Sequence, residues 1–135
     1  ENLWVATGTG AKLEELGEKA YARFPRLGER RHQLAGSLSG GEQQMLALSR
    51  ALGTDPAVLL LDELSMGLAP MIVTRMYETV AALVEGGLSV LVAEQFARAV
   101  LPIADTAALM LHGRVAAVGP PAEIEDRLSS DYLGG

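Results

Sequence analysis

The sequence contains no cysteine and only two lysines, Lys12 and Lys19, among its 135 residues. Without cysteine, disulfide bonds and thiolate metal sites are excluded. The net charge of −6 argues against a nucleic-acid partner, because a surface that binds phosphates needs a basic face. The longest apolar runs, such as 57–61 and 88–93, reach about six residues, whereas a membrane-spanning helix needs roughly 20. The chain therefore suits one globular domain or a large piece of one, and any link to a membrane must pass through a partner.

The scarcity of lysine also bears on nucleotide binding. The common phosphate-binding loop has the pattern Gly-x-x-x-x-Gly-Lys-Ser/Thr, in which backbone amides and the lysine hold the phosphates. Neither lysine of this chain lies in such a pattern. Residues 7–10 read Thr-Gly-Thr-Gly, but no lysine follows at the required spacing, so we interpret them as a turn.

A Ser-Gly-Gly turn is the first feature that indicates chemistry. Residues 38–44 read Leu-Ser-Gly-Gly-Glu-Gln-Gln and open a good helix-forming segment. Glycines let a ligand approach the backbone, and the start of a helix favours an anion. Ser39 can cap the helix or donate to a phosphate oxygen. Taken alone, the turn is better explained by an ordinary serine cap followed by two turn glycines.

A buried strand that ends in two carboxylates is the second such feature. Residues 58–63 read Val-Leu-Leu-Leu-Asp-Glu, and ligands of open α/β sheets lie beyond the carboxyl ends of strands. Adjacent side chains point to opposite sides of an extended chain, so Asp62 and Glu63 suit different roles. Asp62 can hold Mg²⁺, and Glu63 can orient or deprotonate a water molecule. A solvated acidic turn is the alternative for this motif alone.

The two motifs together, in this order and separated by one helix, resemble the signature sequence and the Walker B strand of the ATP-binding-cassette (ABC) ATPases. The resemblance implies an ATPase with the α/β fold of a P-loop NTPase and with ATP and Mg²⁺ as cofactors. It implies that Asp62 holds Mg²⁺ through water and that Glu63 is catalytic. It also implies that the signature contacts ATP held by a second subunit, through Ser39, Gly40, Gly41, Glu42 and Gln43.

Several departures from the common pattern narrow the resemblance. Residues 67–70 read Gly-Leu-Ala-Pro, so Ala69 stands where the family usually has the aspartate of its D-loop. Gln95 follows Glu94 where most members have a switch histidine; its amide can bond a γ-phosphate or a lytic water but cannot carry a proton at neutral pH. Both features resemble ATP-binding subunits of branched-chain amino acid importers. Residues 24–31 and the terminus 131–135 resemble the same subunits.

The periodicity of the chain predicts parallel strands with flanking helices, a helical segment at the N-terminus and a C-terminal hairpin. Expected helices are one capped by Thr9 and ended by Pro25, and others over 41–52, from Pro70 to Gly86-Gly87, over 96–101 and over 122–128. Expected strands, the first two buried on both faces, are 57–61, 88–93, 107–111 and 114–118. We interpret His32 as a surface residue, His112 as a turn residue, and Met66, Met71 and Met76 as packing residues.

The resemblance places residues 1–37 in the family's helical subdomain and 38–135 in the C-terminal part of its ATPase core. The chain is then expected to be a fragment that lacks the phosphate loop and is inactive alone. As a full subunit it would work at the cytoplasmic face of a bacterial membrane, with a second ATP-binding subunit, permease subunits and, indirectly, a periplasmic or extracellular binding protein. Alternatives are a urea or short-amide importer, a non-transport ABC protein, and a non-catalytic interaction module.

Overall fold

A computed structural model describes residues 1–5 and 12–133 of the chain. The expected cap at Thr9 and the turn at 7–10 lie outside the described residues. The chain divides into two compact units, Glu1–Ala93 and Glu94–Gly135, and we describe each by itself. Within the described part of the chain, no helix has the length and apolar character that crossing a membrane requires. The proposed boundary at residue 37 between a helical subdomain and a core stays a prediction.

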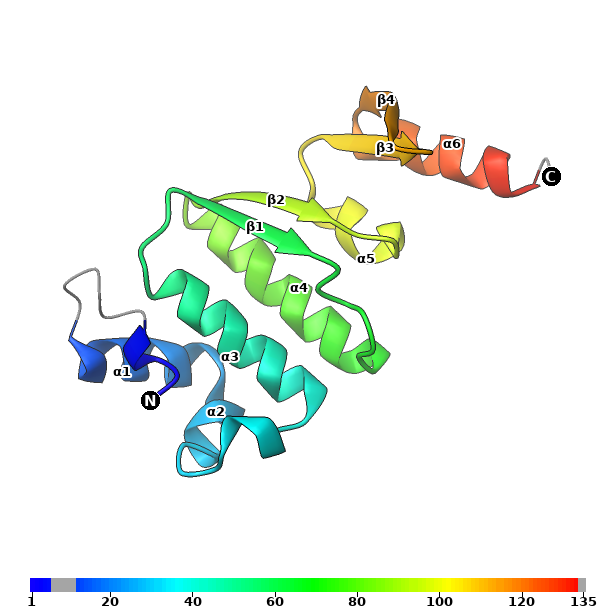
Figure 1. Ribbon diagram of the computed structural model, residues 1–135. Helices are drawn as coiled ribbons and strands as arrows, with labels where there is room; N and C mark the ends of the chain where they lie inside the picture. Colours follow the sequence, from blue (N-terminus) through cyan, green and yellow to red (C-terminus); the bar gives the residue numbers. More distant parts are fainter. Residues whose placement is uncertain (6–11, 134–135) are drawn as a thin grey trace. The chain divides into compact units, whose positions relative to one another are not determined.

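In its described residues, the first unit has four α-helices and a two-stranded parallel sheet (Figure 1). Prolines and glycines mark its element ends as the sequence predicts: Pro70 begins a helix, and Gly53 and Gly86 cap the ends of two. Pro25 ends the first helix and also begins a short second one that was not predicted. The elements are α1 (Leu13–Arg23), α2 (Pro25–Glu29), a short 3-10 helix η2 (Ala35–Ser37), α3 (Gly40–Leu52), β1 (Val58–Asp62), α4 (Pro70–Glu85) and β2 (Ser89–Ala93).

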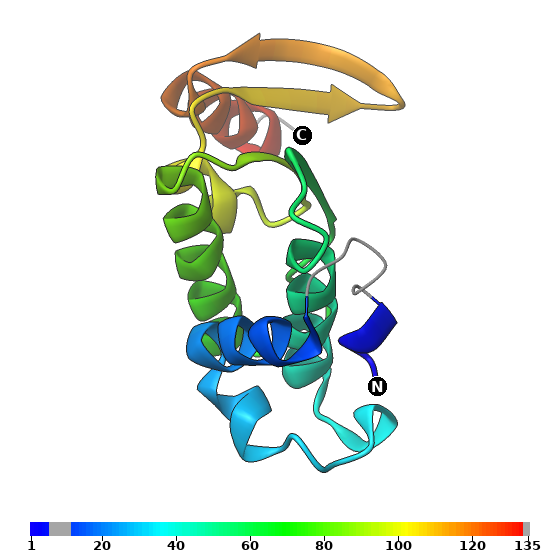
Figure 2. The same ribbon diagram turned by 90° about the vertical axis from the view of Figure 1, so that its left-hand side faces the viewer.

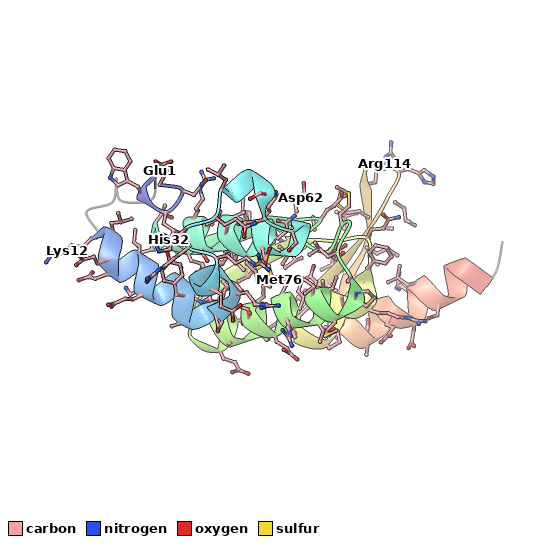
Figure 3. All side chains as sticks on the ribbon, turned by 90° about the horizontal axis from the view of Figure 1, so that it is seen from below. Glu1, Lys12, His32, Asp62, Met76 and Arg114 are labelled. Atoms are coloured by element: carbon pink, nitrogen blue, oxygen red, sulfur yellow. The ribbon has the colours of Figure 1, made fainter. Side chains whose placement is uncertain are left out.

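The sheet and its connecting helix form a β-α-β unit, which confirms the predicted α/β class. Strand β1 pairs with β2 in parallel, with Leu60 opposite Leu91 and Asp62 opposite Ala93. Figure 1 shows α3 and α4 on the same side of the two strands. The core lies between these helices and the strands, where Leu59, Leu61, Met76 and Val80 are buried. Figure 3 shows Met76 among the side chains between α3 and α4.

The expectation that the first two strands are buried on both faces is wrong. Leu59 and Leu61 of β1 are buried, but Val58 and Leu60 are 55% and 70% exposed, and Leu91 of β2 is 64% exposed. The helices of the first unit cover one face of the sheet, whereas Leu60 and Leu91 point from the other. An unbroken apolar run predicts two buried faces only when elements are present to cover both of them.

The second unit contains an antiparallel hairpin followed by a helix. Its elements are α5 (Ala97–Val100), a 3-10 helix η3 (Leu101–Ile103), β3 (Ala107–Leu111), β4 (Arg114–Gly119) and α6 (Pro121–Leu133). His112 and Gly113 both have positive φ, 49° and 76°, as a two-residue hairpin turn requires. The predicted hairpin and the turn role of His112 are confirmed, and α6 extends beyond the expected 122–128.

The methionines are not all packing residues, which corrects the interpretation above. Met76 is fully buried in α4, but Met66 and Met71 are 66% and 67% exposed. Met71 lies near the start of α4, where the helix presents a different face from that of Met76. His32 lies on the surface, as expected, and accepts a hydrogen bond from Arg31 (Nε to Nε2, 3.0 Å).

Candidate nucleotide site

The Ser-Gly-Gly turn is held by a capping box at the start of α3. The backbone N–H of Ser39 donates to the Glu42 carboxylate (2.9 Å), and the Ser39 hydroxyl donates to the same oxygen (2.9 Å). In the reciprocal half of the box, the Glu42 N–H points to the Ser39 hydroxyl oxygen at 3.4 Å. The first intrahelical bond runs from Gln43 N–H to the Ser39 carbonyl, so the amides of Gly40 and Gly41 precede the helical ladder. These two amides are the groups that an anion would meet.

Arg30, which lies outside α3, forms an ion pair with Glu42. Its Nε lies 2.9 Å from the second carboxylate oxygen of Glu42, whose side chain is 13% exposed. The hydrogen bond from the Ser39 backbone lowers the pKa of the Glu42 carboxyl, and the Ser39 hydroxyl and the positive charge of Arg30 lower this pKa further. Both oxygens of the Glu42 carboxylate thus bond to groups at or near the turn. In this structure Glu42 fixes the position of Ser39, and its direct contact with a nucleotide stays a prediction.

The side chain of Gln43 is also turned toward the protein. Its amide nitrogen points to the carbonyls of Leu38 (3.2 Å) and Ala35 (3.4 Å), which belong to the segment before the turn. Gln43 therefore connects residues 35–38, which precede the turn, to α3. Of the five signature residues predicted to meet ATP, the structure leaves Ser39, Gly40 and Gly41 as the groups that form the turn itself.

We expect the stability of the chain to fall on acidification in part because of Glu42. A carboxyl whose pKa is lower in the folded state stabilises that state above its unfolded pKa, about 4.3, and this stability is lost as the pH falls through the folded pKa. Glu42→Gln should therefore lower the free energy of unfolding by about 1 kcal/mol at pH 7, since bonds to a charged acceptor are the stronger ones. The difference between the two proteins should begin to shrink below about pH 4.3 and should be lost as the pH falls through the lowered folded pKa, so it should be smaller at pH 3.5 than at pH 7.

Urea unfolding at pH 7 and pH 3.5 measures both effects. The exposed Glu18 of α1 provides the control, and Glu18→Gln should show no comparable pH-dependent difference. Equal stability of the Glu42→Gln variant and the unmodified chain at pH 7 would contradict the assigned role.

The turn packs directly against the segment that follows β1. A Cβ atom added to Gly40 would lie 3.7 Å from Leu68 Cδ2, and one added to Gly41 would lie 2.8 Å from Ile72 Cγ2. The second distance is shorter than real Cβ contacts allow. Gly41 is therefore required for the close approach of α3 to the start of α4, independently of any ligand. Gly67, at the head of the Gly-Leu-Ala-Pro segment, has a φ of 73° that favours glycine.

Gly41→Ala should destabilise the chain, whereas Gly40→Ala should not. The new methyl group at position 41 meets the branched side chain of Ile72, and such overpacking costs about 1–3 kcal/mol. The higher helix propensity of alanine relative to glycine offsets at most about 1 kcal/mol of this cost. Urea midpoints of the two variants make the comparison, because both add one methyl group to neighbouring residues. A Gly41→Ala variant as stable as Gly40→Ala would show that Ile72 moves aside freely.

Asp62 and Glu63 lie at the end of β1, and both side chains are exposed. Asp62 is the last residue of the strand, and the N–H of Glu63 donates to the carbonyl of Ala93 (2.9 Å). Glu63 has a φ of 49°, in the left-handed region. The prediction that the two side chains diverge because the chain is extended is therefore wrong at Glu63. Its direction is set by a turn, which continues with a bond from Met66 N–H to the Glu63 carbonyl (3.1 Å).

The turn and the carboxylates occupy the same end of the first unit. Figure 1 shows the starts of α3 and α4 at the end where β1 and β2 terminate, and Figure 3 labels Asp62 there. The positive ends of two helices and two exposed carboxylates thus meet at one edge.

This edge provides few ligands for a metal ion. No cluster of three acidic, histidine or cysteine side chains occurs among the described residues. A lone exposed carboxylate such as Asp62 nonetheless fits Mg²⁺, which keeps several waters and takes its remaining ligands from substrate phosphates.

Gln95 lies in the second unit, two residues beyond Ala93. The Glu94 carboxylate accepts hydrogen bonds from the backbone N–H groups of Gln95 (2.9 Å) and Phe96 (3.1 Å), so the segment is a tight turn. The side chain of Gln95 is exposed. Its predicted role toward a phosphate or a water molecule stays a prediction.

Arg30 is the site residue that the sequence did not predict. The nearby Arg26 forms an exposed ion pair with Glu29 (2.6 Å) within its own short helix, α2. Arg30 instead reaches Glu42, which lies in a different helix. The Ser-x-x-Glu spacing of Ser39 and Glu42 is a recognisable capping-box signal. No local sequence pattern predicts that Arg30 contacts Glu42.

Comparison with known proteins identifies the class. Residues 9–65 match the family model described as ABC transporter. The high-affinity branched-chain amino acid transport ATP-binding protein BraG of Pseudomonas aeruginosa is 43% identical over 120 residues, which are 87% of this chain and 52% of that protein. LivF of Archaeoglobus fulgidus, whose name also places it in branched-chain amino acid transport, is 38% identical over 128 residues, which are 92% of this chain and 54% of that protein.

Other transport systems and a solved structure match as well. The phosphate import ATP-binding protein PstB of Thermotoga maritima is 38% identical over 102 residues, which are 73% of this chain and 40% of that protein. A crystallised ATP-binding cassette of an ABC transporter aligns with a TM-score of 0.76 and 30% identity, over 88% of this chain and 48% of that one. The chain therefore belongs to the ABC transporter family of ATP-binding proteins. It spans about half the length of the curated relatives that it matches.

Proposed function

We propose that the chain supplies the signature turn and the Walker B carboxylates of the ATP-hydrolysing subunit of an ABC importer for branched-chain amino acids. The observation that carries the proposal is the arrangement of the capped turn Ser39–Gly41 and the carboxylates of Asp62 and Glu63 at one end of the same unit. The 43% identity to the Pseudomonas protein supports the choice of transporter class.

Each site residue takes a role that suits its geometry. Bound Mg·ATP would supply the transferable γ-phosphoryl group and the charge that neutralises it. The amides of Gly40 and Gly41, with Ser39 positioned by Glu42, bind phosphate oxygens of ATP held by a second subunit. Asp62 would hold the metal ion through water. Glu63 orients and deprotonates the attacking water. The role of Gln95, which lies in the second unit, rests on the resemblance alone.

The proposed partners follow from the same class. A second ATP-binding subunit provides the phosphate-holding loop that faces the signature turn, and permease subunits tie the pair to the cytoplasmic face of the membrane. A periplasmic or extracellular binding protein delivers the solute to the permease. The Gly-Leu-Ala-Pro segment and the Glu94-Gln95 pair favour branched-chain amino acids over the phosphate import that the Thermotoga relative's name indicates.

Replacement of the matching part of the Pseudomonas protein by this chain tests the proposal. The resulting chimera is expressed in a strain that lacks its own copy, and uptake of labelled leucine is measured. We expect uptake within about threefold of that given by the intact Pseudomonas protein, about 0.65 kcal/mol in barrier. A chimera that is expressed and bound to the permease but takes up no more leucine than the empty strain would contradict the assignment.

A further inference from the structure

One hollow of the first unit lies away from the turn and the carboxylates. It has a volume of about 530 Å³ and is lined by ten residues of α1, α2, α3 and α4, together with the junction between α1 and α2. This volume is within the range of about 300–1,000 Å³ that is typical of small-molecule pockets. Figure 2 shows α1 crossing the pair formed by α3 and α4.

One face of α4 forms a wall of this hollow. Its lining residues recur at positions 75, 78, 79, 82 and 83, the spacing of a single helical stripe. This stripe differs from the one that carries Met76 and Val80 into the core. The Thr79 hydroxyl is already used locally, because it donates to the carbonyl of Arg75 (2.9 Å).

The base of the hollow is apolar, and its polar groups are mainly arginines. Phe24 and Met45 are buried and contribute the apolar surface, together with Ala82 and Leu83. The charged lining residues are Arg23, Arg26, Arg75 and Glu78. A chain of net charge −6 thus gathers three of its eleven basic side chains around one concavity.

Among the described residues, two of these guanidinium groups have no carboxylate partner. Arg26 pairs with Glu29, which also raises its pKa. In the described part of the chain, no carboxylate lies within ion-pair distance of Arg23 or Arg75, although Glu78 is one turn from Arg75 on the same helix. Arginine is the side chain best suited to bidentate binding of a carboxylate or phosphate.

We propose that this hollow is a binding site for a small organic anion with an apolar body, held by Arg23 and Arg75 and packed on Phe24 and Met45. The apolar base favours a compact amphipathic molecule over a free inorganic ion. The site is separate from the turn and the carboxylates, and its test does not depend on ATP hydrolysis.

Octanoate is a suitable probe, and isothermal titration calorimetry on the 135-residue chain measures its binding. We expect a dissociation constant below about 1 mM. Octanamide, with the same apolar body and no charge, should bind at least tenfold more weakly, and so should inorganic phosphate. Hexaglutamate represents an acidic peptide and should also bind at least tenfold more weakly.

Variants locate the site. Arg75→Gln and Arg23→Gln should each raise the dissociation constant for octanoate at least tenfold, because each removes one of the charges without a counter-ion. Both arginines are exposed, so thermal melting should confirm that the variants stay folded. Arg50→Gln, on an exposed position of α3 outside the hollow, should leave binding unchanged.

Three results would overturn the proposal. The first is no heat of binding with octanoate at 10 mM, about ten times the highest dissociation constant expected. The second is an absence of charge dependence, seen either as equal binding of octanoate and octanamide or as an affinity that Arg75→Gln leaves unchanged. The third is tighter binding of hexaglutamate than of octanoate, which would assign the hollow to an acidic protein segment.

Discussion

Glu63→Gln should lower ATP turnover at least about 100-fold in the Pseudomonas chimera while ATP binding stays within about threefold. The amide keeps the shape of the side chain but loses the basic oxygen that takes a proton from water. Because Glu63 lies in a turn with its side chain exposed, the substitution should not disturb the fold. Release of inorganic phosphate measures turnover, and equilibrium binding of labelled ATP measures affinity.

Glu85→Gln is the matched control for this substitution. Glu85 is the exposed last residue of α4, at the opposite end of the helix from the proposed site, and its replacement should leave turnover unchanged. A Glu63→Gln variant with turnover within about threefold of the unmodified chimera, less than 1 kcal/mol of barrier, would show that another group acts as the base. Gln95 would then be the first residue to replace.

Met76→Ala should be the most damaging of the packing substitutions. The side chain is fully buried between α3 and α4, and truncation of a buried methionine costs about 2–5 kcal/mol in lost contacts and cavity formation. That loss is a large share of the roughly 5–15 kcal/mol that holds a typical domain folded. Urea unfolding of the chain, followed by circular dichroism, measures the change in the free energy of unfolding.

Two other methionine variants serve as controls for Met76→Ala. Met76→Leu keeps the buried volume and should cost less than about 1.5 kcal/mol. Met71→Ala removes an exposed side chain from the same helix and should change stability by no more than about 0.5 kcal/mol. A loss below about 1 kcal/mol for Met76→Ala would mean that the neighbouring side chains collapse into the space and that the core is not tightly packed there.

Local signals in the sequence predicted much of this fold. Pro70 begins α4, Gly86 caps its end, and His112-Gly113 turns the hairpin, because each residue type restricts the backbone in a way that few neighbours can override. The helix that follows Ser39 was predictable for the same reason, since serine accepts a bond from an otherwise unpaired amide.

The remaining features depend on contacts between distant residues. The pairing of Arg30 with Glu42 joins two segments that share no periodic pattern, so the sequence alone does not predict it. The left-handed backbone of Glu63 arises where its N–H bonds the end of the neighbouring strand, and neither partner is visible from the Asp-Glu pair alone. The exposure of Leu60 depends on which elements cover the sheet, and an apolar run carries no information about that.

The central proposal is that this chain supplies the signature turn and the Walker B carboxylates, while another part of the protein supplies the phosphate-holding loop. Its most direct test uses two complementary pieces. One is this chain, and the other is the part of the Pseudomonas protein that the chain leaves unmatched. We predict that neither piece alone binds Mg·ATP more tightly than about 100 µM or releases phosphate, and that a co-refolded mixture does both. Hydrolysis by the chain alone would contradict this result, since no phosphate-holding loop occurs in its sequence. A folded mixture that binds ATP without hydrolysing it would show that Ser39, Asp62 and Glu63 do not form a catalytic site.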